Sequence, residues 1–99
     1  MAQRIVLYWR DIPAQVIVRK GRTNAKRELP ERFGVAIDAC AMRVGAKDSD
    51  AYLAEWRKGD AEEVGDDLEA EAQSAHDALD AEYDRETIKR LVAADGWNR

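Results

Sequence analysis

The chain has 99 residues, of which 36% are charged, and it carries a net charge of −4 and a single cysteine. This length suits one modest core, so we expect residues 1–99 to form a single domain. A single cysteine excludes an intrachain disulfide, and the acidic balance argues against a nucleic-acid-binding domain, which is usually basic. The apolar run at residues 5–9 is too short for a signal peptide or a membrane span. We therefore expect a cytoplasmic protein.

The strongest strand pattern lies at the N-terminal end. Residues 4–10 and 14–20 are rich in β-branched and aromatic side chains, and Asp11-Ile12-Pro13 interrupts the pattern between them. We expect an antiparallel β-hairpin with its bend at these three residues. The predicted core face of the first strand holds Ile5, Leu7 and Trp9, and its other face holds Arg4, Val6, Tyr8 and Arg10. Because an isolated hairpin is marginal in water, the rest of the chain must complete it.

The middle of the chain is predicted to cover and extend this hairpin. Residues 21–24 are typical of a turn, and residues 25–28 fit a helical segment that Pro30 would kink. A helix is predicted near residues 30–44, with Gly45 after its end. Its apolar stripe contains Leu29, Phe33, Ile37, Cys40 and Val44. A polar loop should follow at residues 45–50.

The stretch at residues 52–57 fits both a strand and a helix. We favour a strand, because the hairpin needs a third one. A short edge strand is predicted at residues 62–64. Residues 65–99 should then form acidic helices: Asp66 or Asp67 caps the first, Asp84 caps the second, Gly96 ends it, and Trp97 can fold back. Residues 1–64 would hold the sheet and the first helix, which together predict an α+β fold.

Charge is unevenly distributed along the chain. Residues 1–32 hold eight basic and three acidic side chains, whereas residues 60–86 hold twelve acidic side chains against Arg85 alone. Two interpretations are open. The two charged faces can attract each other within the fold, or one of them can dock a partner of opposite charge.

Three segments together resemble a small bacterial family. They are Tyr8–Val18, Asp50–Asp60 and Glu63–Glu71. The combination is similar to the family labelled "virulence factor" and to the C-terminal domain of the staphylococcal conserved virulence factor C. The resemblance implies no reaction, cofactor or catalytic residue. Stand-alone members tend to lie beside genes of folate- and corrinoid-dependent one-carbon metabolism, which implies an accessory subunit of such an enzyme as an alternative function.

The candidate catalytic and metal-binding residues give no catalytic or metal site. His76 is the only histidine and lies off the apolar stripe of its helix, whereas Cys40 lies on an apolar face, so we expect no Cys–His nucleophile. The stretch from Asp60 to Glu71 resembles a calcium-binding loop in its acidic spacing. However, Val64 and Leu68 would occupy two of the ligand positions. We predict no catalytic residue, metal or cofactor.

Two kinds of binding surface remain. A nucleic-acid site, the less favoured, would use Tyr8 or Trp9 for stacking and the basic residues Arg10, Arg19, Lys20, Arg22, Lys26 and Arg27 for phosphates. The aromatic residues are numerous for so small a core. They either fill that core or form a protein-binding surface, since aromatic and Arg side chains dominate such surfaces.

We therefore predict a non-enzymatic interaction module or a small accessory subunit of a larger bacterial complex. Its protein partner would contact Tyr8, Trp9, Arg10 and Trp56. No membrane association is expected, and the sequence leaves a homo-oligomer open.

Overall fold

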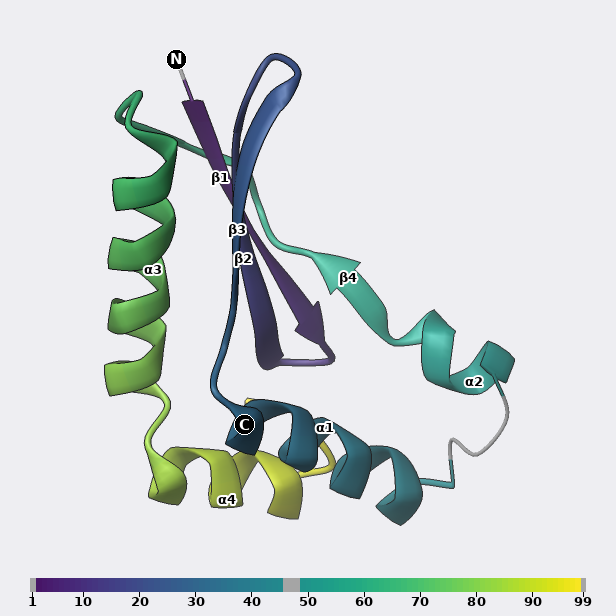
Figure 1. Cartoon of the computed structure of the whole chain (residues 1–99). Coiled ribbons are helices and arrows are strands. Elements are labelled where there is room, and N and C mark those ends of the chain that lie inside the picture. The colour runs from purple at the N-terminus through teal and green to yellow at the C-terminus, as the bar shows by residue number, and fades with distance from the viewer. Residues whose placement is uncertain (1, 46–48, 99) are drawn as a thin grey trace.

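A computed structural model describes residues 2–45 and 49–98 (Figure 1). In chain order its elements are β1 (Ala2–Trp9), β2 (Ile12–Lys20), β3 (Thr23–Glu28), α1 (Glu31–Arg43), α2 (Ser49–Ala54), β4 (Trp56–Lys58), β5 (Glu62–Val64), α3 (Leu68–Glu82) and α4 (Arg85–Ala93). The α+β class is thereby confirmed. The loop predicted at residues 45–50 lies partly outside the described residues, and Asp50 belongs to α2.

The strands form one antiparallel sheet in the order β3-β2-β1-β4, and β5 also pairs with β1. The predicted hairpin is present, but its turn lies at Arg10 and Asp11. The predicted bend is wrong for Ile12 and Pro13, which are buried residues of β2. Pro13 lies opposite Tyr8, next to an irregularity of the register, and such a position tolerates the missing N–H of proline.

Two predictions for the middle of the chain need correction. The helical alternative for residues 25–28 is wrong, because they belong to the edge strand β3, which pairs with β2. The strand predicted at residues 52–57 is right only at its end, since α2 takes Ser49–Ala54 and β4 begins at Trp56. The edge strand predicted at residues 62–64 is confirmed as β5.

The helix boundaries follow the capping residues. α1 begins directly after Pro30, and its cap at the C-terminal end is Val44. The Asp67 side chain accepts a hydrogen bond from the Ala70 amide at 3.2 Å and so caps α3. The Asp84 side chain does the same for α4, from the Thr87 amide at 2.9 Å. Both predicted caps, and the break between α3 and α4, are confirmed.

Helix α3 covers one face of the sheet, while α1 and α4 gather at one end of it (Figure 1). Under α3, Val16 and Val18 pack against Ala72 and Ala75. This is the face of β1 that carries Val6, so the face predicted to be the outer one is in fact covered by a helix. A second cluster lies at the end of the sheet, and its buried members are Trp9, Ile12, Leu29, Phe33, Ala36, Ile37, Cys40, Ala41, Ile88 and Leu91.

The opposite face of the sheet is only partly covered. Trp9 lies at its covered end, where α1 packs, and Ile5 is buried between neighbouring strands. Leu7 and Ile17 are half-buried on this face. Ile17 belongs to neither of the two hydrophobic clusters of the described residues.

Within residues 2–45 and 49–98, no helix is long and apolar enough to cross a membrane.

Candidate functional site

The structure does not bring the four predicted contact residues together on one surface. Trp9 is fully buried, and its Nε1 donates a hydrogen bond to the Tyr52 carbonyl at 3.0 Å. Its ring also packs on that of Tyr52, with 6.0 Å between centroids. The Trp9 indole therefore belongs to the core and has no free surface, so direct contact with a partner is left to Tyr8, Arg10 and Trp56 as a prediction.

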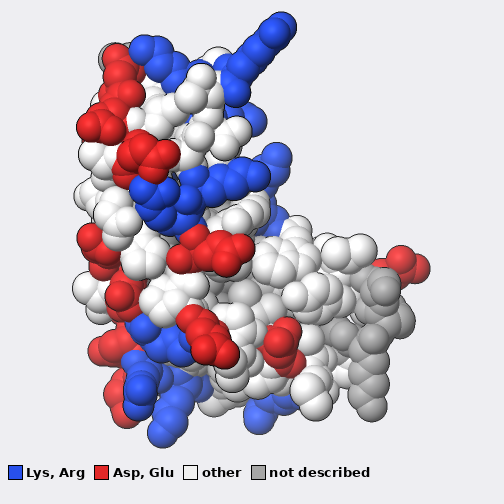
Figure 2. Space-filling view, viewed as in Figure 1, with Lys and Arg blue, Asp and Glu red and all other residues white. Residues whose placement is uncertain are grey.

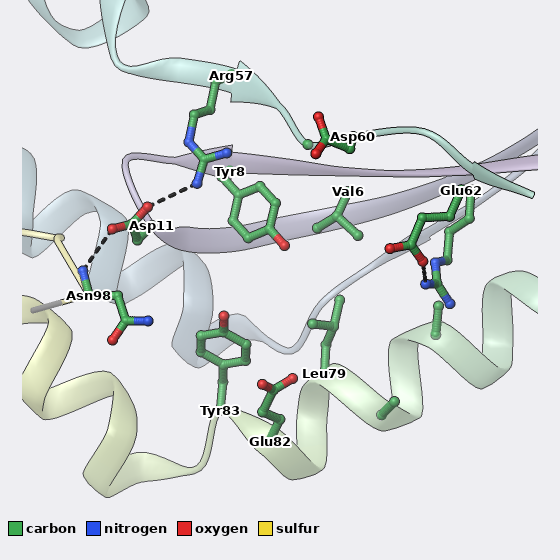
Figure 3. A pocket seen from close by; sticks show the side chains of 14 residues that line it. Val6, Tyr8, Asp11, Arg57, Asp60, Glu62, Leu79, Glu82, Tyr83 and Asn98 are labelled. Carbon is green, nitrogen blue, oxygen red and sulfur yellow. Dashed lines mark hydrogen bonds and ion pairs between the residues drawn. The ribbon is translucent and has the colours of Figure 1, made fainter.

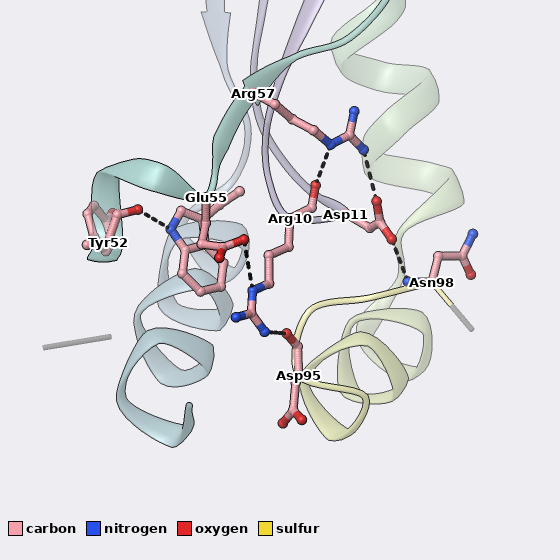
Figure 4. A network of polar contacts seen from close by, with 8 residues as sticks. Arg10, Asp11, Tyr52, Glu55, Arg57, Asp95 and Asn98 are labelled. Carbon is pink, nitrogen blue, oxygen red and sulfur yellow. Dashed lines mark hydrogen bonds and ion pairs between the residues drawn. The ribbon is translucent and has the colours of Figure 1, made fainter. Parts of the chain in front are cut away.

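Arg10 joins the hairpin turn to two distant segments (Figure 4). Its guanidinium lies 5.3 Å from the Trp9 ring centroid and 5.1 Å from that of Trp97. Nη1 donates a hydrogen bond to the Asp95 carbonyl at 2.6 Å, and Nε lies 3.2 Å from the Glu55 carboxylate. The Arg10 side chain thus makes its contacts within the fold. Its guanidinium lies against the ring of Trp97, which folds back onto the body as predicted.

A second set of polar contacts lies beside Arg10 (Figure 4). Arg57 donates hydrogen bonds to the Arg10 carbonyl and to the Asp11 carboxylate, both at 2.9 Å. The other carboxylate oxygen of Asp11 accepts a hydrogen bond from the backbone amide of Asn98 at 2.7 Å. These contacts fasten β4 and the C-terminal segment to the hairpin turn.

A cavity of about 610 Å³ lies between β1 and α3, with Tyr8 and Tyr83 on its walls (Figure 3). We call it the tyrosine cavity. Its lining comprises Arg4, Val6, Tyr8, Asp11, Arg57, Gly59, Asp60, Glu62, Ala75, Ala78, Leu79, Glu82, Tyr83 and Asn98. Burial raises the pKa of both tyrosine hydroxyls above the usual value of 10.0, so both stay protonated at neutral pH.

Most charges of the tyrosine cavity already have partners. Arg4 pairs with Glu62, and Arg57 pairs with Asp11 and lies 4.5 Å from the Tyr8 ring centroid. Among the described residues, the side-chain carboxylates of Asp60 and Glu82 have no hydrogen bond or ion pair. This cavity can hold a small polar molecule through hydroxyl and carboxylate groups, but it offers no activated nucleophile.

Two further reactive side chains, those of Cys40 and His76, do not line the tyrosine cavity. Cys40 is buried in the cluster under α1, and burial raises its pKa. His76 lies on α3, where its Nδ1 is 3.0 Å from Asp77, and this hydrogen bond lowers the pKa of Asp77. In residues 2–45 and 49–98, no three His, Cys, Asp or Glu side chains gather as a metal site would require.

A second depression, of about 660 Å³, lies between the sheet, α1 and the α2–β4 segment. We call it the α1–α2 groove. It is lined by Leu7, Ala14, Gln15, Glu28, Leu29, Pro30, Glu31, Gly34, Val35, Ile37, Asp38, Tyr52 and Trp56. Tyr52 and Trp56 meet edge to face at 6.0 Å, and the Val35 side chain is 58% exposed. Sequence reasoning singled out Trp56, and it predicted the helix α1 but not that this helix forms a wall of the groove. The available signal was Val35, an apolar residue off the predicted stripe.

The basic residues near the N-terminus are partly neutralised within the fold. Lys20 lies 3.4 Å from Asp66, and Arg27 binds Glu69 and Gln73 of α3. Figure 2 shows acidic side chains along α3 and basic ones near the β2–β3 turn. The interpretation that the two charged faces attract each other accounts for these pairs. Together with Arg10, half of the six predicted phosphate-binding side chains are therefore already engaged.

Taken together, these features define an α+β protein whose surface includes the tyrosine cavity and the α1–α2 groove and, among its described residues, no recognisable catalytic group. The model of the family described as "Virulence factor" matches residues 7–92, so the chain belongs to that family. Neither the search of curated proteins nor the search of solved structures found a match.

Proposed function

We propose that this protein is a non-enzymatic interaction module or small accessory subunit that docks a protein partner in the α1–α2 groove. One observation carries the proposal: the groove has large apolar and aromatic walls, and an apolar side chain of α1, Val35, is 58% exposed beside them. Apolar surface gathered in a concave place is typical of a binding site.

The aromatic residues of the groove support protein binding in particular. Trp and Tyr are the residues that contribute most to protein interfaces, and Trp56 and Tyr52 stand together on one wall. Trp9 packs on Tyr52 from the core side, and Arg10 stacks on Trp9. In this proposal Trp56 contacts the partner, Trp9 and Arg10 hold the wall in place, and Tyr8 lies in the tyrosine cavity.

A charge placed in the groove tests the proposal. Val35→Glu puts a carboxylate on the apolar wall, and Met42→Glu is the matched control. Met42 lies on the same helix, is 75% exposed and does not line the groove. Both variants should fold as the wild type does, which circular dichroism checks.

The readout is the set of proteins that each immobilised variant retains from a lysate of the source organism, quantified by mass spectrometry. We expect that at least one protein binds both the wild type and Met42→Glu but does not bind Val35→Glu. Identical sets on all three, or nothing retained by the wild type beyond an unrelated bait, would contradict the proposal.

A second candidate is a cofactor-binding accessory subunit of a folate- or corrinoid-dependent methyl-transfer enzyme in the cytoplasm. The tyrosine cavity favours it by its volume of about 610 Å³. Its lining holds four carboxylates, on Asp11, Asp60, Glu62 and Glu82, against the guanidinium groups of Arg4 and Arg57. This balance disfavours a ligand that carries carboxylates itself, as folates do. Stoichiometric copurification with a methyltransferase, and loss of its activity without this chain, would favour the second candidate.

A further inference from the structure

The charged side chains around the α1–α2 groove are all acidic. They are Glu28 from the end of β3 and Glu31 and Asp38 from α1, and no Lys or Arg lines the groove. All three are exposed. Within the described residues none of them takes part in an ion pair or a side-chain hydrogen bond. The charged residues that line the groove are therefore negative, and the described residues provide them with no ion pair.

Several acidic side chains elsewhere in the chain are paired within the fold. Asp80 binds Arg32 at 2.6 Å, and Glu69 of α3 binds Arg27 of β3. Asp11 binds Arg57 at 2.9 Å. In each of these three pairs a guanidinium lies opposite the carboxylate. Among the described residues no guanidinium lies opposite the carboxylates of the groove, so a cationic partner would complement them.

The floor of the groove restricts the backbone conformation of what can bind there. Leu7 of β1 and Gln15 of β2 belong to inner strands, because β1 pairs with β2 and β4 and β2 pairs with β1 and β3. An added strand therefore finds no free ladder on this floor. A helix brings its own backbone hydrogen bonds and needs only apolar contact.

We propose that the α1–α2 groove binds a basic amphipathic helix of a partner protein, an inference that rests on the proposed function above. Apolar side chains spaced at i, i+3 or i+4 and i+7 enter between Leu7, Val35 and Trp56. Lysine or arginine side chains beside this stripe reach Glu28, Glu31 and Asp38. The helix lies on the side of the sheet opposite α3.

Two designed peptides test the chemistry of the occupant. Both are helical and share one stripe of leucine and alanine, and their remaining positions are lysine in one and glutamate in the other. Binding to the full chain is followed by the fluorescence of labelled peptide. The lysine peptide should bind at least about tenfold more tightly than the glutamate peptide, since complementary charge at the rim adds to the shared apolar contact.

Charge reversal on α1 supplies the second arm. In the double variant Glu31→Lys with Asp38→Lys, the preference should shift by at least about tenfold toward the glutamate peptide. The matched control is Glu86→Lys with Glu63→Lys. It changes the net charge equally, because it also replaces two acidic residues by lysine. Its positions are comparable, since Glu86 also lies in a first helical turn and Glu63 is an exposed residue of β5. The control should keep the preference of the wild type.

The outcomes separate this inference from the proposed function. Equal binding of both peptides, or no binding of either, overturns the basic helix as occupant, while capture that depends on Val35 still supports docking at the groove. A preference that shifts equally in the control variant also overturns the inference, because it would reflect net charge alone. If Val35→Glu leaves capture from the lysate unchanged, the proposed function itself fails.

Discussion

Trp9 and Trp56 face each other across β1 and β4, yet they lie in opposite environments. Trp9 has no exposed surface, and its Nε1 is bonded to the Tyr52 carbonyl. Trp56 is half-buried and lines the α1–α2 groove. The tryptophan of β1 therefore makes all its contacts within the fold, while the tryptophan of β4 keeps part of its aromatic surface exposed. An aromatic cluster read from sequence holds both kinds of residue, and only the packing separates them.

The two depressions differ in the surface that they offer. In the tyrosine cavity Arg4, Arg57 and Asp11 have partners inside the chain, whereas the carboxylates of Asp60 and Glu82 have none among the described residues. In the α1–α2 groove Glu31 and Asp38 have none among the described residues. Charges that are already paired stabilise the fold, while unpaired charges around an apolar surface can contribute to association. Both depressions hold unpaired carboxylates, but only the groove sets them beside an exposed apolar side chain of α1 and an aromatic wall, which is the reason for placing the docking site there.

The largest expected effect separates the two tryptophans. Trp9→Ala should lower the free energy of unfolding by about 3–5 kcal/mol, because it empties a buried site. Trp56→Ala should cost only about 1 kcal/mol, because its side chain is partly exposed to water already. Urea denaturation followed by circular dichroism measures both. Equal losses would remove the distinction between core and groove tryptophan.

Arg10 tests whether the polar contacts at the hairpin turn matter for the fold. Arg10→Lys keeps the charge but loses the planar group between Trp9 and Trp97, and we expect a loss of about 2 kcal/mol in unfolding free energy. Arg22→Lys is the control, since Arg22 is exposed in a turn. If thermal and urea unfolding of the two variants coincide, Arg10 is not the connection that the structure indicates.

Two glycines test how tightly each depression is packed. A Cβ at Gly59 would lie 2.9 Å from the Tyr8 ring and 3.2 Å from the Val6 carbonyl, so Gly59→Ala should cost about 1–2 kcal/mol.

Gly34 lies on α1 beside the groove, where no heavy atom comes within 4 Å of an added Cβ. Gly34→Ala should therefore stabilise the chain by about 0.5–1 kcal/mol through helix propensity. The opposite order of these two melting temperatures would contradict the packing described for the cavity and the groove.

The smallest effect concerns α4, the helix that packs behind α1. Hydrogen bonds from Thr87 hold the pKa of Asp84 below its ordinary value of 3.8. Because the folded pKa is lowered, this stabilisation is fully present above about pH 3.8 and is lost as the pH falls through the folded pKa. The difference in unfolding free energy between wild type and Asp84→Asn should therefore shrink on acidification below that pH. A difference that stays constant across this range would exclude the charged cap as its source.

Much of the fold could be predicted from the sequence. The hairpin, the helix after Pro30, and the caps at Asp67 and Asp84 follow from side-chain pattern and capping chemistry. β3 could not be predicted, because Thr23–Glu28 has one buried apolar residue, Ala25, and its strand state comes from pairing with β2. α2 was missed because Tyr52–Arg57 alternates like a strand, although only its last residues pair with β1.

The candidate site was only partly predictable. Trp56 stands out by residue type, whereas Val35 and the acidic residues of α1 look like an ordinary solvent-exposed helix face in the sequence. Their role in the groove depends on the packing of α1 at the end of the sheet, next to the α2–β4 segment. Trp9 could not be told from Trp56 by composition, since burial of Trp9 depends on α2 and on the C-terminal segment that Arg10 holds.

The most direct test that a basic helix docks in the groove is an NMR titration of the isotopically labelled chain with the lysine-bearing peptide. The account predicts that the signals of Leu7, Gly34, Val35 and the Trp56 indole shift together. Those of Val18, Ala25 and Ala75, on the face covered by α3, should stay in place. Shifts confined to the α3 side or to the tyrosine cavity, or a spectrum unchanged at excess peptide, would contradict docking of a basic helix in the α1–α2 groove.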